Sequence, residues 1–169
     1  MTCIVGIADG TNVWMAADGG ACGSDVIVSA VSPKVVKVDE FLIAYSGDGF
    51  GIGQLVPLAD YPLDNVNLPI ELRLTFCKSM SKLINKYGGV ANGSSHLLVG
   101  GYGRLFEVYS DDWGIVEVTE TSLGTGAAYA LGSLYTSQGE HPRTRLVRAV
   151  GAAITYSPTC QGPIEVLSV

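Results

Sequence analysis

The chain is poor in charge, in histidine and in cysteine. Charged side chains make up 15% of its 169 residues, where about 25% is usual for soluble domains, so we expect apolar surface that meets other subunits. The two histidines, His96 and His141, are isolated, and the four cysteines form no CxxC pair. This pattern excludes a histidine triad, a zinc motif and a dense disulfide framework. We therefore predict neither a metal nor a cofactor.

Long apolar runs and basic clusters are also missing. The longest apolar stretches, such as residues 41–45 and 149–154, are well short of the roughly 20 residues that cross a bilayer, which excludes a membrane span. The opening residues, Met-Thr-Cys-Ile-Val-Gly-Ile, lack the form of a secretory signal, so we expect a cytoplasmic protein. The net charge is −6 and only Arg143, Arg145 and Arg148 cluster. Nucleic-acid binding is therefore not expected.

Short apolar runs between turn residues fill the first third of the chain, and we interpret residues 1–169 as one domain. The pattern predicts a hairpin over 3–17, with its turn at Asp9-Gly10-Thr11. Glycines at 19, 20 and 23 interrupt the next run, which resumes over 26–31, and a second hairpin is expected over 34–45.

The rest of the chain alternates helical and strand patterns. A Gly-rich link over 46–53 precedes a helix to about residue 58, and apolar residues at helical spacing predict a long helix from Pro69 to Tyr87. Further predicted elements are a three-stranded meander over 96–118, helices over 127–137 and 142–156, and a strand over 163–169. Two groups of strands and two pairs of helices indicate an α+β fold, a four-layer αββα sandwich of two antiparallel sheets flanked by helices.

The chemistry is concentrated near the start of the chain. A threonine at a free N-terminus supplies both a hydroxyl and a base for attack on an amide. Thr2 is followed sixteen positions later by Asp18, in Ala16-Ala17-Asp18, and thirty-two positions later by Lys34. In these residues and intervals the chain resembles the proteasome β-subunit and HslV family of N-terminal-nucleophile (Ntn) threonine peptidases.

The resemblance implies a role for each matching residue. Thr2 becomes the nucleophile once Met1 is removed, Lys34 favours the ionised hydroxyl, and Asp18 holds Lys34 and keeps it protonated. Gly47, in Ile43-Ala-Tyr-Ser-Gly47, matches the family's oxyanion-hole donor. Thr125, in Gly124-Thr125-Gly126, matches the serine that positions the threonine amine and water.

The resemblance also implies a substrate and partners. Ala21, Tyr45 and Ser46 are the expected substrate-binding residues, with Tyr45 in the pocket for the side chain before the scissile bond. The substrate is an unfolded polypeptide, cleaved inside a homo-oligomeric ring that an unfolding ATPase can serve. The sequence departs from the family near its end, where residues 151–157 carry no carboxylate. Thr155 and Ser157 are the candidate replacement hydroxyls there.

Three other interpretations fit parts of the sequence. A chain that keeps Met1 and lacks the late carboxylate would be a catalytically silent ring scaffold. The same Thr2 chemistry would also serve an amidase acting on a small molecule, since one fold hosts several functions. A dyad of Cys3 with His96 or His141 is the third, although this thiol follows the candidate terminus.

Overall fold

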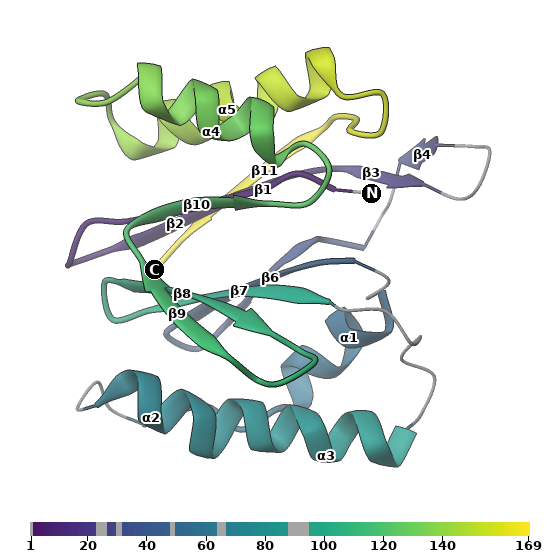
Figure 1. Cartoon of the computed structure of the whole chain (residues 1–169), viewed down its shortest axis with the longest axis vertical. Coiled ribbons are helices and arrows are strands. Elements are labelled where there is room, and N and C mark those ends of the chain that lie inside the picture. The colour runs from purple at the N-terminus through teal and green to yellow at the C-terminus, as the bar shows by residue number, and fades with distance from the viewer. Residues whose placement is uncertain (1, 23–26, 30–31, 48–49, 64–66, 88–94) are drawn as a thin grey trace.

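The computed structural model describes residues 2–22, 27–29, 32–47, 50–63, 67–87 and 95–169. Two antiparallel sheets stack face to face and helices cover both outer faces, so the molecule has four layers (Figure 1). The α+β sandwich expected from the sequence is confirmed. No helix in these described ranges is long and apolar enough to cross a membrane.

The four-stranded sheet joins the two ends of the chain. Its strands are β1 (Ile4–Ala8), β2 (Val13–Asp18), β10 (Glu120–Leu123) and β11 (Ile164–Ser168), in the order β10-β1-β2-β11. The hairpin between β1 and β2 turns at Asp9, whose Oδ1 accepts hydrogen bonds from the N–H groups of Thr11 and Asn12. This pairing sets Ile4 opposite Ala17 and so brings Asp18 to the beginning of the chain.

The five-stranded sheet runs β5-β6-β7-β8-β9 in space and in sequence. Its strands are β5 (Val35–Val38), β6 (Phe41–Ser46), β7 (His96–Gly101), β8 (Arg104–Tyr109) and β9 (Ile115–Val118). The helices on its outer face are α1 (Phe50–Leu55), the 3-10 turn η1 (Val56–Leu58), α2 (Leu68–Leu72), the π-helical turn η2 (Arg73–Cys77) and α3 (Lys78–Tyr87). The long helix predicted from Pro69 therefore contains a π turn.

Two helices cover the four-stranded sheet, and a small ribbon extends beside it. The helices are α4 (Ala127–Thr136) and α5 (Pro142–Tyr156), as the sequence predicts. His141 caps α5 by accepting a hydrogen bond at Nδ1 from the Arg143 N–H, 3.2 Å away. The ribbon is formed by β3 (Gly20–Cys22) and β4 (Ile27–Ser29).

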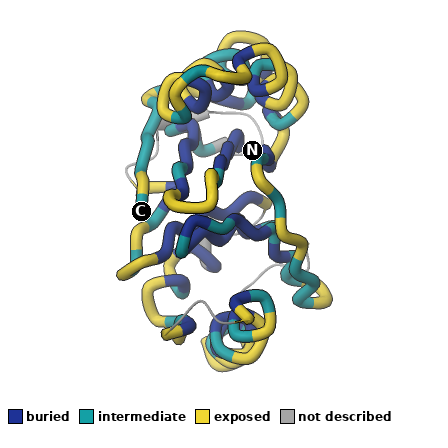
Figure 2. Tube along the Cα trace, turned by 90° about the vertical axis from the view of Figure 1, so that its left-hand side faces the viewer, coloured by how far each residue is buried: buried dark blue, intermediate teal, exposed yellow. Residues whose placement is uncertain are grey.

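Buried residues form three layers that follow the sandwich (Figure 2). One lies between the two sheets and includes Ile4, Met15 and Leu98. The layer under α1–α3 is rich in aromatic side chains, whereas the layer under α4 and α5 consists largely of alanine, valine, leucine and cysteine.

The structure corrects four details of the sequence-based expectation. The strands do not form one sheet per sequence group, since β5 and β6 pair with the meander whereas β10 and β11 pair with β1 and β2. Strand β10 was not predicted. Residues Gly20–Cys22 form a strand, where a break was expected. Helix α1 begins at Phe50, inside the expected glycine link.

Candidate active site

Asp18, at the end of β2, is the centre of a buried hydrogen-bond network. Its Oδ1 accepts from the Cys3 N–H at 2.7 Å and from Lys34 Nζ at 2.8 Å. Its Oδ2 accepts from the N–H groups of Gly20 and Gln161, both at 3.1 Å. Each carboxylate oxygen of Asp18 accepts two hydrogen bonds. One oxygen atom of Asp18 is thus shared by the Lys34 ammonium and the backbone next to Thr2.

The ion pair of Asp18 and Lys34 is almost completely buried. Asp18 is 1% exposed and Lys34 is 3% exposed. Lys34 lies just before β5, which belongs to the other sheet, so the pair joins the two sheets at one edge of the sandwich. A buried charge without its partner is strongly destabilising, and therefore each of these two residues requires the other.

Thr2 is 7% exposed, and its backbone is fixed by contacts with the loop before α4. Its carbonyl oxygen accepts a hydrogen bond from the Gly126 N–H at 3.2 Å. Gly124, with φ of +93°, passes so close that a Cβ there would overlap the same carbonyl oxygen. The backbone conformation and the contact both require glycine at this position. The loop before α4 therefore fixes the residue that carries the candidate hydroxyl.

The end of β6, at Ser46 and Gly47, lies close to the Gly124 loop that contacts Thr2. Ser46 is 9% exposed, and its Oγ would lie 3.1 Å from a Cβ added at Gly124. Gly47 follows with φ of +111° and is exposed. The positive φ favours glycine, and exposure next to Ser46 is what a donor to a substrate oxygen requires. Its oxyanion role and the substrate-binding role of Ser46 remain predictions.

Tyr45 points to the other side of β6. Its side chain belongs to the cluster under α1–α3, where a Cβ at Gly53 would overlap the ring. The hydroxyl donates to the Pro33 carbonyl at 3.1 Å. Burial, and secondarily the charge of Glu165, raise the pKa of Tyr45. In this structure Tyr45 supports the segment before Lys34, and its role in a substrate pocket remains a prediction.

Ala21 lies on the ribbon, opposite Val28, and is half-buried. A cavity of about 350 Å³ opens nearby beside the ion pair, and its lining includes Gly19, Lys34 and Glu165. Burial raises the pKa of the Glu165 carboxyl above its ordinary value. The predicted contact of Ala21 with substrate stays a prediction.

Thr125 is part of a row of hydroxyl groups. Its Oγ1 lies 2.8 Å from Thr159 Oγ1, which in turn lies 3.1 Å from Ser157 Oγ. Ser157 is 5% exposed. Of the two candidate replacement hydroxyls, Ser157 joins this row, whereas Thr155 Oγ1 donates to the Gly151 carbonyl inside α5 at 2.9 Å.

The sequence interpretation missed Thr159, Gln161 and Ser122. Ser122 Oγ donates to the Ile4 carbonyl at 2.8 Å and so ties β10 to the strand that follows Thr2. No motif marks these residues. Gln161 acts through its backbone N–H, which most residue types supply, and Thr159 lies far from Thr125 in sequence.

The alternative dyad of Cys3 with a histidine receives no support from the geometry. Burial raises the pKa of Cys3 to about 12, and the neighbouring Cys160 adds to this shift. A thiol that stays protonated at neutral pH is a weak nucleophile. His96 packs its ring against Tyr109, with centroids 4.8 Å apart, and His141 caps α5. No group of three or more potential metal ligands occurs in the described part of the chain.

Comparison with known proteins gives a structural likeness without a sequence match. No family model matches the sequence, and no curated protein matches it. Among solved structures, BPH from Thiobacillus denitrificans in complex with epoxomicin superposes with a TM-score of 0.80 at 18% identity, covering 100% of this chain and 98% of BPH.

Two further structures agree with this result. BPH from the same organism, in a second structure, gives a TM-score of 0.79 at 17% identity, with 100% of this chain and 97% of BPH covered. Eukaryotic HslV from Trypanosoma brucei gives 0.71 at 14% identity, with 99% and 98% covered. The chain therefore has the fold of these proteins along its whole length.

Proposed function

We propose that the protein is an N-terminal threonine peptidase whose nucleophile is Thr2 after removal of Met1. The observation that carries this proposal is the single oxygen of Asp18 that binds both Lys34 Nζ and the backbone N–H beside Thr2. This shared oxygen supports a fixed position for the Lys34 ammonium group close to Thr2, which carries the hydroxyl. The fold shared with BPH and HslV supports the same assignment.

The proposed reaction begins with a proton transfer at Thr2. The free α-amino group accepts the hydroxyl proton, while the positive charge of Lys34 favours the developing alkoxide. Thr2 Oγ1 attacks the carbonyl carbon, and the oxyanion accepts a hydrogen bond from the Gly47 N–H. The C–N bond breaks as the leaving amine takes the proton, and water then hydrolyses the ester on Thr2.

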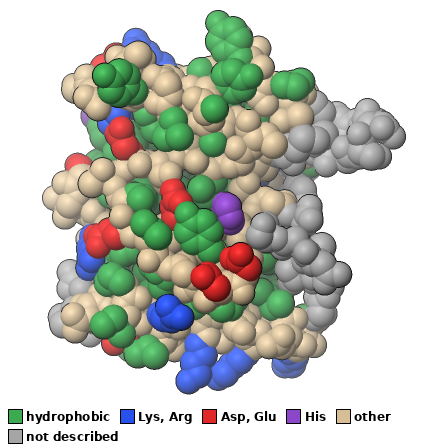
Figure 3. Space-filling model, in the orientation of Figure 1, with side chains coloured by type: hydrophobic (Ala, Val, Ile, Leu, Met, Phe, Trp, Pro, Cys, Tyr) green, Lys and Arg blue, Asp and Glu red, His purple; other side chains and the backbone are tan. Residues whose placement is uncertain are grey.

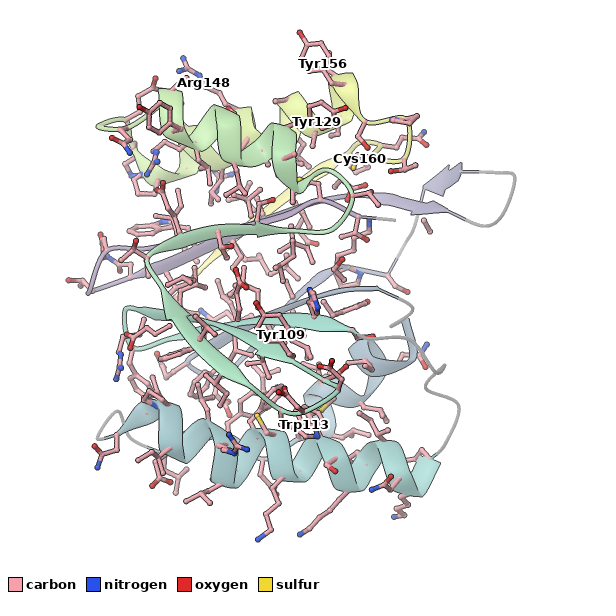
Figure 4. The ribbon with its side chains drawn as sticks, in the orientation of Figure 1. Tyr109, Trp113, Tyr129, Arg148, Tyr156 and Cys160 are labelled. Atoms are coloured by element: carbon pink, nitrogen blue, oxygen red, sulfur yellow. The ribbon has the colours of Figure 1, made fainter. Side chains whose placement is uncertain are left out.

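The proposed substrate is an unfolded polypeptide, cleaved inside a ring of copies of this chain. Exposed apolar side chains on α4 and α5 support subunit contacts, and Figure 3 shows hydrophobic side chains along these helices at the top of the molecule. Tyr129 and Tyr156 stand there with ring centroids 6.1 Å apart (Figure 4). An unfolding ATPase remains a proposed partner.

A silent ring scaffold is the second candidate. The absence of a carboxylate from residues 151–157 favours it, because such a group would help to fix the threonine amine. In its place the structure offers the hydroxyl row of Thr125, Thr159 and Ser157. In a peptidase, we assign to this row the positioning of the Thr2 α-amino group and of the attacking water.

Mass spectrometry with a covalent probe separates these candidates. We expect the intact protein to lack Met1 and a peptide epoxyketone to add once, at Thr2. Thr2→Ala should abolish the adduct without unfolding the chain, whereas Thr136→Ala, on the exposed face of α4, should keep it. Retained Met1 with no adduct would favour the scaffold. An adduct on Cys3 would refute the assignment to Thr2.

Ring assembly tests the remaining alternative. Analytical ultracentrifugation should detect a closed homo-oligomer, and peptide substrates should turn over. A monomer that hydrolyses small amides but no peptides would favour the amidase.

A further inference from the structure

Two cysteines from opposite ends of the chain meet beneath the loop that holds Thr2. Cys3 is 0% exposed and Cys160 is 6% exposed, and both belong to the cluster under α4 and α5. Both also border Gly126. A Cβ added at Gly126 would lie 2.8 Å from Cys3 Cβ and 2.9 Å from Cys160 Sγ. Because a single carbon atom would touch both residues, the two side chains are close neighbours.

Only one of the two thiols can be reached from the surface. Cys160 lies in the loop after α5 (Figure 4) and lines an open cavity of about 430 Å³ together with Ser157 and Gln161. Cys3 lies deeper, with its Sγ 4.0 Å from Ser122 Oγ. A small oxidant that enters the cavity therefore meets Cys160 first.

We propose that Cys3 and Cys160 are a modification site that takes a reversible disulfide in the presence of a peroxide. In the first step Cys160 Sγ attacks a peroxide oxygen, the O–O bond breaks, and water or an alcohol leaves. Cys160 is then a sulfenic acid. In the second step Cys3 Sγ attacks the Cys160 sulfur, the S–O bond breaks, and the Cys3 proton leaves with the hydroxide as water. Because the Cys3 thiol is protonated at neutral pH, this second step is the slow one. Two thiols thus supply the two electrons that reduce the peroxide.

The position of this disulfide couples it to the candidate active site. The Cys3 N–H donates to Asp18 Oδ1, and the N–H of Gln161, next to Cys160, donates to Asp18 Oδ2. Cys3 Sγ lies 4.0 Å from Ser122 Oγ, and closing the bond requires it to come within about 2 Å of Cys160 Sγ. Both backbone segments that hold Asp18 are then joined. This consequence rests on the proposed function, and we expect slower acylation of Thr2 in the oxidised protein.

Peptide mapping of the full chain under non-reducing conditions tests the disulfide itself. After treatment with hydrogen peroxide, we expect a linked peptide of Cys3 and Cys160, a loss of two hydrogen atoms from the intact mass, and reversal by dithiothreitol. Cys77→Ala, in the aromatic cluster far from this pair, should keep the link, and Cys160→Ser should remove it. Oxidation of Cys160 to a sulfinic acid, or its pairing with another cysteine, would overturn the proposal.

The labelling rate of Thr2 by a peptide epoxyketone tests the coupling. We expect a fall of about tenfold or more on oxidation, because displacements of about 1 Å in a catalytic group can cost about a hundredfold in rate. A disulfide-linked protein whose Thr2 is labelled as fast as in the dithiol protein would overturn the coupling. Absence of labelling in both redox states counts against the proposed peptidase function. The peptide map and the intact mass still test the disulfide in that case.

Discussion

The two halves of the sandwich are packed with different side chains. Under α1–α3, the five-stranded half buries large groups, among them Phe41, Phe76 and Phe106. Under α4 and α5, the four-stranded half buries small ones, among them Ala130, Ala149 and Ala153. Aromatic side chains bury the largest areas, so the layer under α1–α3 should contribute much of the stability. This layer lies on the outer face of the five-stranded sheet, whereas Lys34 and Ser46 bring the other side of that sheet to the candidate site.

Small side chains in the four-stranded half allow backbone segments to approach the candidate site. A Cβ at Gly126 would lie 2.8 Å from both Ala153 Cβ and Cys3 Cβ, closer than ordinary packing permits. The same loop donates to the Thr2 carbonyl. This half therefore has little tolerance for added volume, and substitutions in it should change the reaction at Thr2 more than their effect on stability would suggest.

The largest expected effect is on Lys34. Lys34→Met leaves the Asp18 carboxylate buried without its cation, which should lower the free energy of unfolding by about 3–5 kcal/mol and the labelling rate of Thr2 by about a hundredfold or more. Lys37→Met, on an exposed position of the neighbouring strand, is the matched control and should change stability by less than about 0.5 kcal/mol. Urea unfolding and probe labelling measure both. Equal effects of the two variants would contradict the role of Lys34.

A comparable loss of stability without loss of reactivity should follow from a substitution in the aromatic layer under α1–α3. Phe76 is 0% exposed and packs on Tyr61, with ring centroids 5.3 Å apart. Phe76→Ala should cost about 3–5 kcal/mol of unfolding free energy, measured by urea titration. The folded fraction should still label Thr2 at the normal rate. A large fall in that rate would show that the two halves are not separable.

A smaller change is expected at Gly124. Gly124→Ala places a Cβ against the Thr2 carbonyl at a φ of +93°, so it should cost at least about 1–3 kcal/mol and slow labelling. Gly139→Ala is a matched control, since its φ is +86° and no atom lies within 4 Å of the added Cβ. It should show the backbone cost alone, with normal labelling. If both variants label at the normal rate, the Gly124 loop does not position Thr2.

The smallest effect belongs to an exposed ion pair of the five-stranded half. Arg104 donates to both carboxylate oxygens of Glu117, at 2.7 and 2.6 Å, but the two side chains are 32% and 46% exposed. Glu117→Gln should therefore cost no more than about 1 kcal/mol, less in high salt. Thermal unfolding at two salt concentrations measures this. A larger loss would mean that this strand edge contributes more than its exposure implies.

Much of the fold was predictable because local chemistry decides it. The Asp9 turn, the bounds of α4 and α5 and the meander all follow from patterns within short stretches of chain. Strand β10 was not predictable, because Glu120, Thr121 and Ser122 are polar. Strand β10 joins the sheet by pairing with β1, with Thr121 opposite Gly6. The Thr121 hydroxyl also donates to Glu107 across the sandwich, a contact that no local pattern shows.

The candidate site was predictable only where a sequence motif marks its residues. The family resemblance of Thr2, Asp18 and Lys34 implied an ion pair that the structure contains, while the catalytic roles of these residues stay predictions. Gln161 and Thr159 escaped prediction because they contact Asp18 and Thr125 from the end of the chain. Tyr45 turned towards the helices because alternate residues of a strand face opposite sides, and Ser46 next to it faces Gly124 instead.

A high-resolution crystal structure of the chain without Met1 tests the central claim most directly. The measurement is the distance between Thr2 Oγ1 and Lys34 Nζ. We expect a hydrogen-bonding separation of about 3 Å, with Asp18 still bound to Lys34. A Lys34 ammonium that faces away from Thr2, with no water or other group connecting the two atoms, would contradict it.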